Sequence, residues 1–142
     1  MSNVTLEQAA TIIDTALSAG RKMGLAPLTF AVLDAGGHLV AMKREDKSSL
    51  LRFDIASGKA WGALGMGAST RAMGGRYERN PGFFGAVAIL ADGRMPTSPG
   101  GVLILDSDGD VIGAVGASGD SGDNDEKCVL TGIEAAGLVA GD

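Results

Sequence analysis

The chain has 142 residues, of which 45% are hydrophobic and 20% charged, as expected for one globular domain (1–142) that buries a core without disulfides. Its formal net charge of −5 argues against nonspecific nucleic-acid binding, which needs a basic surface. A single cysteine, Cys128, excludes an internal disulfide, and neither a signal-peptide pattern nor an apolar run of about 18 residues occurs, so we expect a cytoplasmic protein without a membrane span.

The first predicted element is a helix from about residue 5 to residue 24. Thr5 followed by Gln8 is typical of a capping box at a helix N-terminus. Apolar or small residues then recur at three- and four-residue spacing, as on one buried helix face: Leu6, Ala9, Ala10, Ile13, Leu17 and Gly20. Gly24 and Pro27 indicate where this helix ends.

Two short strands follow, over residues 28–34 and 38–44. The break between them, Ala35-Gly36-Gly37, is a hairpin signal because glycine accepts the positive φ that such turns require. Strands joined this closely must be antiparallel. We expect Asp34 and Arg44, one on each strand, to pair across the hairpin and fix its register.

Helical spacing returns over residues 48–67 and again, interrupted by two glycines, over 70–79. Asn80-Pro81-Gly82 predicts a firm break. Residues 83–101 contain two prolines and several glycines, and we expect them to form mostly loop.

A second hairpin is predicted from strands over 102–105 and 111–117, because Asp-Gly lies in the turn between them. A last helix is expected over about 125–139, with acidic residues in its first turn that complement the helix dipole. Two hairpins with helices between them predict an α+β fold, with an antiparallel sheet of four to five strands flanked by helices.

Several separated motifs resemble the GlcG/HbpS-like family, in the expected order over residues 5–140. They are Val32-Leu33-Asp34-Ala35-Gly36-Gly37-His38-Leu39-Val40, Arg44-Glu45-Asp46, Lys59-Ala60, Ser98-Pro99-Gly100-Gly101-Val102, Gly113-Ala114-Val115-Gly116-Ala117-Ser118-Gly119 and Asp125-Glu126-Lys127-Cys128. The resemblance implies a profilin-like or sensor-type antiparallel sheet and assembly into homo-oligomers. One departure is Leu103, where many members have proline.

Functions vary within the family that the chain resembles. Members include a secreted haem-binding sensor accessory protein, a glycolate-locus protein and the C-terminal domain of PduO-type cobalamin adenosyltransferase. Some members from catabolic gene clusters are small hydrolases or isomerases. The resemblance therefore implies haem or another small anionic molecule as ligand, with no other cofactor, and a fold does not by itself fix the chemistry.

Nine of the twelve Lys and Arg residues lie within 43–94, a charge distribution that fits either an anion site or a solvated face. Arg44 is a candidate for binding a carboxylate or a haem propionate in a bidentate manner. Arg71, Arg76 and Tyr77 belong to a mixed basic and apolar stretch, typical of a ligand wall or, more often, of a subunit interface.

The turn of Pro99, Gly100 and Gly101 would place backbone N–H groups close to an anionic ligand, although glycines also simply let the chain turn into the next strand. His38 is the only histidine, so a multi-histidine metal site is excluded. It is a candidate haem-iron ligand, and the simpler interpretation is an exposed turn residue.

Lys59 falls on an otherwise small, apolar helix face. Partial burial there would lower its pKa and make it a base or nucleophile, whereas a lysine at the edge of the face would keep its ammonium in solvent. Asp125 would be the accompanying acid if the protein is an enzyme, and helix capping is the simpler explanation.

The leading hypothesis is a homo-oligomeric protein that binds haem or another small anionic metabolite. Arg44, Lys59, the stretch 71–84 and the turn 98–101 would converge in one cleft between subunits. The alternative is a cofactor-independent hydrolase or isomerase of a small carboxylated catabolic intermediate, with Lys59 or Asp125 moving a proton. Neither hypothesis includes nucleic acid or a membrane as a partner.

Overall fold

The computed structural model describes residues 2–142, which form five helices and a five-stranded sheet. In chain order the elements are α1 (Leu6–Lys22), β1 (Thr29–Asp34), β2 (Leu39–Arg44), α2 (Arg52–Met66), α3 (Thr70–Arg79), α4 (Pro81–Leu90), β3 (Gly101–Leu105), β4 (Val111–Ser118), α5 (Gly122–Ala135) and β5 (Val139–Gly141). None of the helices within this part of the chain combines the length and the apolar character needed to cross a bilayer.

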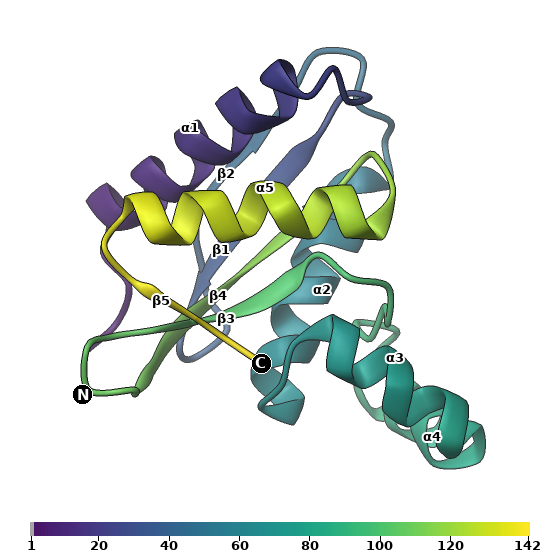
Figure 1. The fold of residues 1–142 in the computed structure, drawn as a ribbon. Coiled ribbons are helices and arrows are strands. Elements are labelled where there is room, and N and C mark those ends of the chain that lie inside the picture. Colours follow the sequence, from purple (N-terminus) through teal and green to yellow (C-terminus); the bar gives the residue numbers. More distant parts are fainter. Residues whose placement is uncertain (1) are drawn as a thin grey trace.

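The sheet has the order β2-β1-β4-β3-β5, and all neighbouring strands are antiparallel. Helices α1 and α5 cover one face, and α2 lies on the other, while α3 and α4 project from the body (Figure 1). The predicted α+β fold with an antiparallel sheet is confirmed. The two predicted hairpins supply four of the five strands, β1 with β2 and β3 with β4. The pairing of β1 with β4 joins the hairpins into one sheet.

The main core lies between the sheet and the pair α1 and α5. Apolar side chains of alternate strand residues point into this layer, as the period of two in a strand requires. They meet a buried face of α1, on which the predicted Ala9, Ile13 and Gly20 lie together with Ile12 and Ala16, whereas the predicted Leu6 is 66% exposed. The largest fully buried members of this layer are Ile12, Ile13, Leu28, Phe30, Val32, Ile104, Val115, Val129 and Ile133.

Helix α2 packs directly on the opposite face of the sheet. Gly101 and Gly116 are paired neighbours on β3 and β4, and they leave this part of the sheet without side chains. A Cβ at Gly101 would lie 2.6 Å from the carbonyl oxygen of Lys59, and a Cβ at Gly116 would collide with that of Ala56. The glycines therefore allow backbone-to-backbone contact, which brings Lys59 down onto the sheet.

The predicted loop over residues 83–101 is wrong for its first part, because α4 covers Pro81–Leu90. Pro81 occupies the first helical turn, where its missing N–H group costs no hydrogen bond. The proline therefore begins a helix here instead of preventing one. Only residues 91–100 remain without regular helix or strand.

The predicted helix over 125–139 is displaced from the observed one. Helix α5 begins at Gly122, after Ser121, whose hydroxyl accepts a hydrogen bond from the Asn124 N–H. It ends at Ala135, and Gly137, with a φ of 73°, turns the chain into the short strand β5 beside β3. This fifth strand is not predicted from the sequence as a separate element.

Candidate functional site

Lys59 is the most deeply buried of the charged side chains within residues 43–94, with 2% of its surface exposed. It is the central residue of α2, where the helix contacts the glycine pair of β3 and β4. The close helix-to-sheet contact leaves the side chain no route along the surface. The expected burial of Lys59 is confirmed and goes further than the partial burial predicted, whereas the alternative of an ammonium at the edge of the face is wrong.

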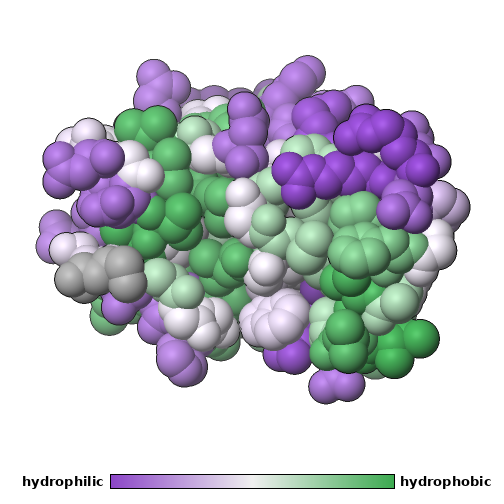
Figure 2. Space-filling view, turned by 90° about the horizontal axis from the view of Figure 1, so that it is seen from below, coloured by the Kyte–Doolittle hydropathy of each residue, from purple (hydrophilic) through white to green (hydrophobic). Residues whose placement is uncertain are grey.

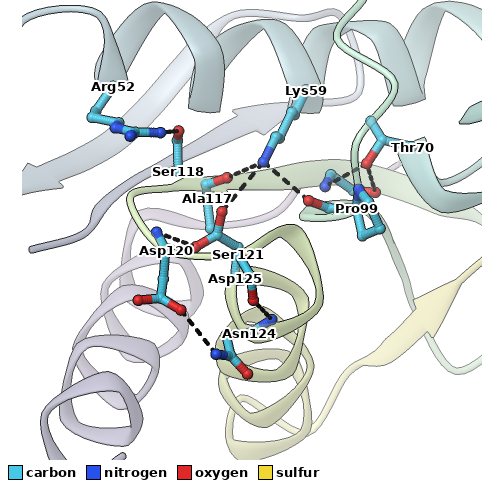
Figure 3. Close-up of polar contacts among 11 residues, drawn as sticks. Arg52, Lys59, Thr70, Pro99, Ala117, Ser118, Asp120, Ser121, Asn124 and Asp125 are labelled. Carbon is cyan, nitrogen blue, oxygen red and sulfur yellow. Dashed lines mark hydrogen bonds and ion pairs between the residues drawn. The ribbon is translucent and has the colours of Figure 1, made fainter. Parts of the chain in front are cut away.

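Three oxygen atoms surround the ammonium group of Lys59 (Figure 3). Nζ donates to the carbonyl of Ala117 at 2.8 Å and to that of Pro99 at 3.0 Å, and lies 3.4 Å from Oδ2 of Asp125. An ammonium has three donors, so these oxygens satisfy it completely. The network ties α2 to β4, to the 98–101 turn and to α5.

Asp125 is the counter-charge, with 1% of its surface exposed. Its second oxygen, Oδ1, accepts a hydrogen bond from the Asp120 N–H at 3.0 Å, just before α5 begins. Burial raises the pKa of Asp125 and lowers the pKa of Lys59, because removal from water disfavours the charged form of each. The two groups offset part of that cost by facing each other.

The 98–101 turn closes over this pair instead of opening to solvent. Gly101 donates its N–H to Oγ1 of Thr70 at 2.9 Å, and Gly100 has a φ of 126°, which suits only glycine. A Cβ at Gly100 would lie 2.9 Å from Nζ of Lys59. The backbone oxygen of Pro99 points at the lysine, so the turn presents an acceptor there and not an anion nest.

Further polar side chains continue the network toward the N-terminus of α2, and the sequence analysis did not find them. Arg52 donates to Oγ of Ser118 at 3.0 Å (Figure 3). Beside it, the hydroxyls of Thr29 and Ser48 share a buried hydrogen bond of 2.7 Å. Only tertiary structure brings these residues together, and no sequence spacing signals their contact.

Arg44 lies apart from the Lys59 network on the outer strand β2. It pairs in register with Thr29, at the end of the hairpin opposite the turn, so the predicted contact with Asp34 is wrong. The error is geometric, because Asp34 is the strand residue next to the turn. Arg44 instead lines an open depression of about 410 Å³ with Arg21, Pro27, Glu45 and Asp46.

The arginines of α3 also fail to converge on Lys59. Arg71 forms ion pairs with Asp123 and, at 3.1 Å, with Glu126, and so ties α3 to the N-terminal end of α5. Arg76 and Tyr77 lie exposed on the second half of α3, in the part that projects from the body (Figure 1). Of the predicted site residues, the structure brings together Lys59, Asp125 and the 98–101 turn.

An open apolar surface surrounds the single tryptophan, Trp61, on the side of α2 away from the network. Two adjacent depressions of about 160 and 170 Å³ share Trp61 and Gly65, and their other lining residues are Ala35, Gly36, Gly37, Leu64, Met66, Val87, Leu90, Ala91 and Met95. The guanidinium of Arg94 lies 3.7 Å from the tryptophan ring centre, a cation–π contact. In Figure 2 apolar area gathers at the end of the molecule formed by α3 and α4, next to hydrophilic area.

His38 lies in the β1–β2 turn that borders this surface. Its side chain is 81% exposed, and Nδ1 lies 3.1 Å from Oδ1 of Asp34. The same carboxylate oxygen accepts hydrogen bonds from the backbone N–H groups of Gly36 and His38. These bonds lower the pKa of Asp34, with the His38 N–H as the largest cause.

Comparison with known proteins places the chain in a family. The family model described as haem degrading protein HbpS-like matches residues 4–134. The chain belongs to the HbpS-like family. This finding confirms the resemblance that the separated motifs indicate, and it covers both the Lys59 network and the Trp61 surface.

A relative and two solved structures extend the comparison. An uncharacterised 15.0 kDa protein in the dhaT-dhaS intergenic region of Citrobacter freundii is 28% identical over 138 residues, 90% of this chain and 94% of that protein. The crystal structure of a PduOC:heme complex matches with a TM-score of 0.88 at 21% identity and covers 99% of both chains. A double mutant of Streptomyces reticuli HbpS matches with a TM-score of 0.81 at 25% identity, over 94% of this chain and 87% of that one.

The hydrolase or isomerase alternative depends on Lys59 and Asp125 reaching a substrate. Both are enclosed, and each acceptor around the ammonium belongs to the protein itself. Contact with a substrate would require the 98–101 turn to leave Thr70 and uncover the pair. The observed geometry is that of a structural ion pair that fixes how α2, β4 and α5 pack.

Proposed function

We propose that this HbpS-like protein binds haem on the apolar surface around Trp61. The observation that carries the proposal is the pair of adjoining depressions that share Trp61 and Gly65, one mainly apolar and the other lined by Gly36 and Gly37. The family match and the likeness to a haem complex support the choice of ligand. The Arg44, Lys59 and 98–101 cleft is not part of this proposal, because its members do not form one open cavity.

The residues present fit the chemistry of haem. A porphyrin is flat and apolar, and Gly36, Gly37 and Gly65 leave room for a flat ring along the tryptophan. Arg94 uses Nε to donate to the Ala91 carbonyl, and its remaining amino groups can bind a propionate. When bound, haem would supply an iron centre whose properties depend on its ligands and its exposure to solvent.

A titration with haemin tests the proposal. We expect a saturable shift of the Soret band in the wild-type protein. Gly65→Leu would place a side chain in both depressions, and we expect it to weaken haemin binding at least tenfold. A Cβ at Gly65 comes no closer than 3.7 Å to any neighbouring side chain or non-local atom, so the fold should tolerate this change.

Gly82→Leu is the matched control, because it adds the same side chain to an exposed helical glycine of α4 with nothing within 4 Å. Equal binding by the two variants would place the haem elsewhere on the protein. The absence of any saturable shift in the wild type would refute haem binding. A small anionic metabolite would then be the remaining ligand class, tested by the same variants in calorimetry.

We also propose that the protein assembles into homo-oligomers through α4. Phe83, Ile89 and Leu90 are 53%, 79% and 85% exposed on a helix that carries no charged side chain. Contiguous exposed apolar area of this kind is typical of interaction surfaces. Light scattering after size-exclusion chromatography measures the mass. We expect Ile89→Lys to lower it, and a monomeric wild type would contradict the assembly.

A further inference from the structure

The β1–β2 turn holds the only histidine in a defined orientation. Oδ1 of Asp34 accepts hydrogen bonds of 3.0 Å from the N–H groups of Gly36 and His38, which fixes the carboxylate. The same oxygen lies 3.1 Å from Nδ1 of the imidazole. The ring is therefore restrained at one nitrogen, although the side chain as a whole is exposed.

This contact determines which ring nitrogen is free. An ionised carboxylate is only an acceptor, so Nδ1 must carry the proton that it shares with Asp34. In the neutral imidazole the lone pair then belongs to Nε2. A carboxylate on one nitrogen and a free lone pair on the other is the arrangement that metal-ligating histidines use in proteins.

The imidazole adjoins the glycine floor of the Trp61 surface. A Cβ at Gly36, which lines one depression, would lie 2.9 Å from Cε1 of His38. A Cβ at Gly37, with a φ of 84°, would lie 3.3 Å from Nε1 of Trp61. The histidine therefore borders Gly36, and the tryptophan borders Gly37, the next residue in the chain.

From this geometry we infer that His38 supplies the protein ligand to haem iron through Nε2, with Asp34 as its positioning residue. The inference rests on the proposed haem binding at Trp61 and adds the iron ligand. Gly36, Gly37 and Trp61 would hold the porphyrin, and His38 would supply the imidazole to its iron. Any side chain at these glycines would push the imidazole or the indole aside.

The tautomer can be measured in the protein without haem. Because His38 is the only histidine, long-range ¹H–¹⁵N correlation spectra contain a single imidazole spin system. We expect the pattern of a neutral ring protonated at Nδ1 in spectra recorded at alkaline pH. Asp34→Asn should shift the population toward the other tautomer. A ring protonated mainly at Nε2 in the wild type would overturn the inference.

The ligation itself is tested by titrating His38→Ala with haemin and with metal-free protoporphyrin IX. We expect haemin affinity to fall at least tenfold with loss of the histidine-ligated Soret and electron paramagnetic resonance signals. Affinity for the metal-free ring should change less than twofold, since iron ligation plays no part. Free imidazole should restore the wild-type haemin spectrum to the variant.

The outcomes separate the two proposals. If the wild type binds haemin and His38→Ala gives the same spectrum, the iron ligand lies elsewhere, and haem binding at Trp61 stands. If the wild type binds no haemin, both fail. Asp34→Asn should keep haemin binding but raise the haem midpoint potential, because the imidazole loses an anionic partner. An unchanged potential would refute the positioning role of Asp34.

Discussion

Replacing Lys59 by methionine removes the charge from the buried pair while keeping most of the side-chain volume. Asp125 then remains 1% exposed, with its Oδ1 still held by the Asp120 N–H and its Oδ2 without a cation. The carbonyls of Pro99 and Ala117 lose a donor at the same time. We expect a large loss of stability, because nothing else in the network can replace the ammonium.

Two estimates of that loss agree. Removing one partner of a buried ion pair typically costs about 3–5 kcal/mol. Asp125 can avoid the uncompensated charge by taking up a proton, which at pH 7 costs about 4 kcal/mol for a carboxyl of ordinary pKa. Protonation therefore limits the penalty to about the same value. A domain of this size has roughly 5–15 kcal/mol in all, so Lys59→Met should remain folded but be much less stable.

Urea unfolding followed by circular dichroism measures the effect, and a double mutant tests its cause. In Lys59→Met/Asp125→Asn the neutral amide keeps an acceptor for the Asp120 N–H, so the double variant should be more stable than Lys59→Met alone by about 1–3 kcal/mol. If the two substitutions simply add, the pair is not coupled. A loss below about 1 kcal/mol in Lys59→Met would mean that water reaches the site.

Three further predictions concern stability and local opening. Because folding raises the pKa of Asp125, the folded state holds this proton more tightly than the unfolded state, and the free energy of unfolding falls as pH rises through that pKa. In Lys59→Met the fall between about pH 4 and pH 7, measured by urea midpoints, should exceed that of the wild type. Gly116→Ala should cost about 1–3 kcal/mol or more because its Cβ collides with the α2 backbone, whereas Gly65→Ala on the open side of α2 should stabilise by roughly 0.5–1 kcal/mol. Arg71→Ala should accelerate hydrogen exchange in α3 but not in α1, since it releases the ion pairs to α5.

The fold was largely predictable because its signals are local. The capping box at Thr5, the glycine break between β1 and β2 and the Asp-Gly turn between β3 and β4 each determine a structure within a few residues. Prediction failed where one local signal has two meanings. A proline breaks a helix when it lies in the helix interior but suits the first helical turn, where Pro81 lies. The residues after Pro81 carry no pattern that distinguishes a helix from a loop.

The candidate site was less predictable because charge and exposure depend on tertiary contacts. The sequence singled out Lys59, Asp125 and the 98–101 turn, and these do meet, 66 residues apart in the case of the ion pair. Their enclosure comes from the glycines beneath α2, which no pattern in the helix itself reveals. Trp61 and Arg94 carry no motif, and Asp34 with His38 shows only the spacing of a side-chain-capped turn.

The ion-pair network and the Trp61 surface should be separable, because they lie on different sides of α2 and share no side chain. Substitutions at distant sites without common partners add in free energy. His38→Ala should therefore change haemin binding while leaving the free energy of unfolding within about 0.5 kcal/mol of the wild type, and Gly65→Leu should weaken haemin binding without lowering that free energy. Lys59→Met should lower the free energy of unfolding and leave haemin binding unchanged, under conditions where the variant stays folded. Coupling between the two sets of variants would show that the buried pair acts on the ligand surface, and the division of this fold into a closed framework and an open binding face would then be wrong.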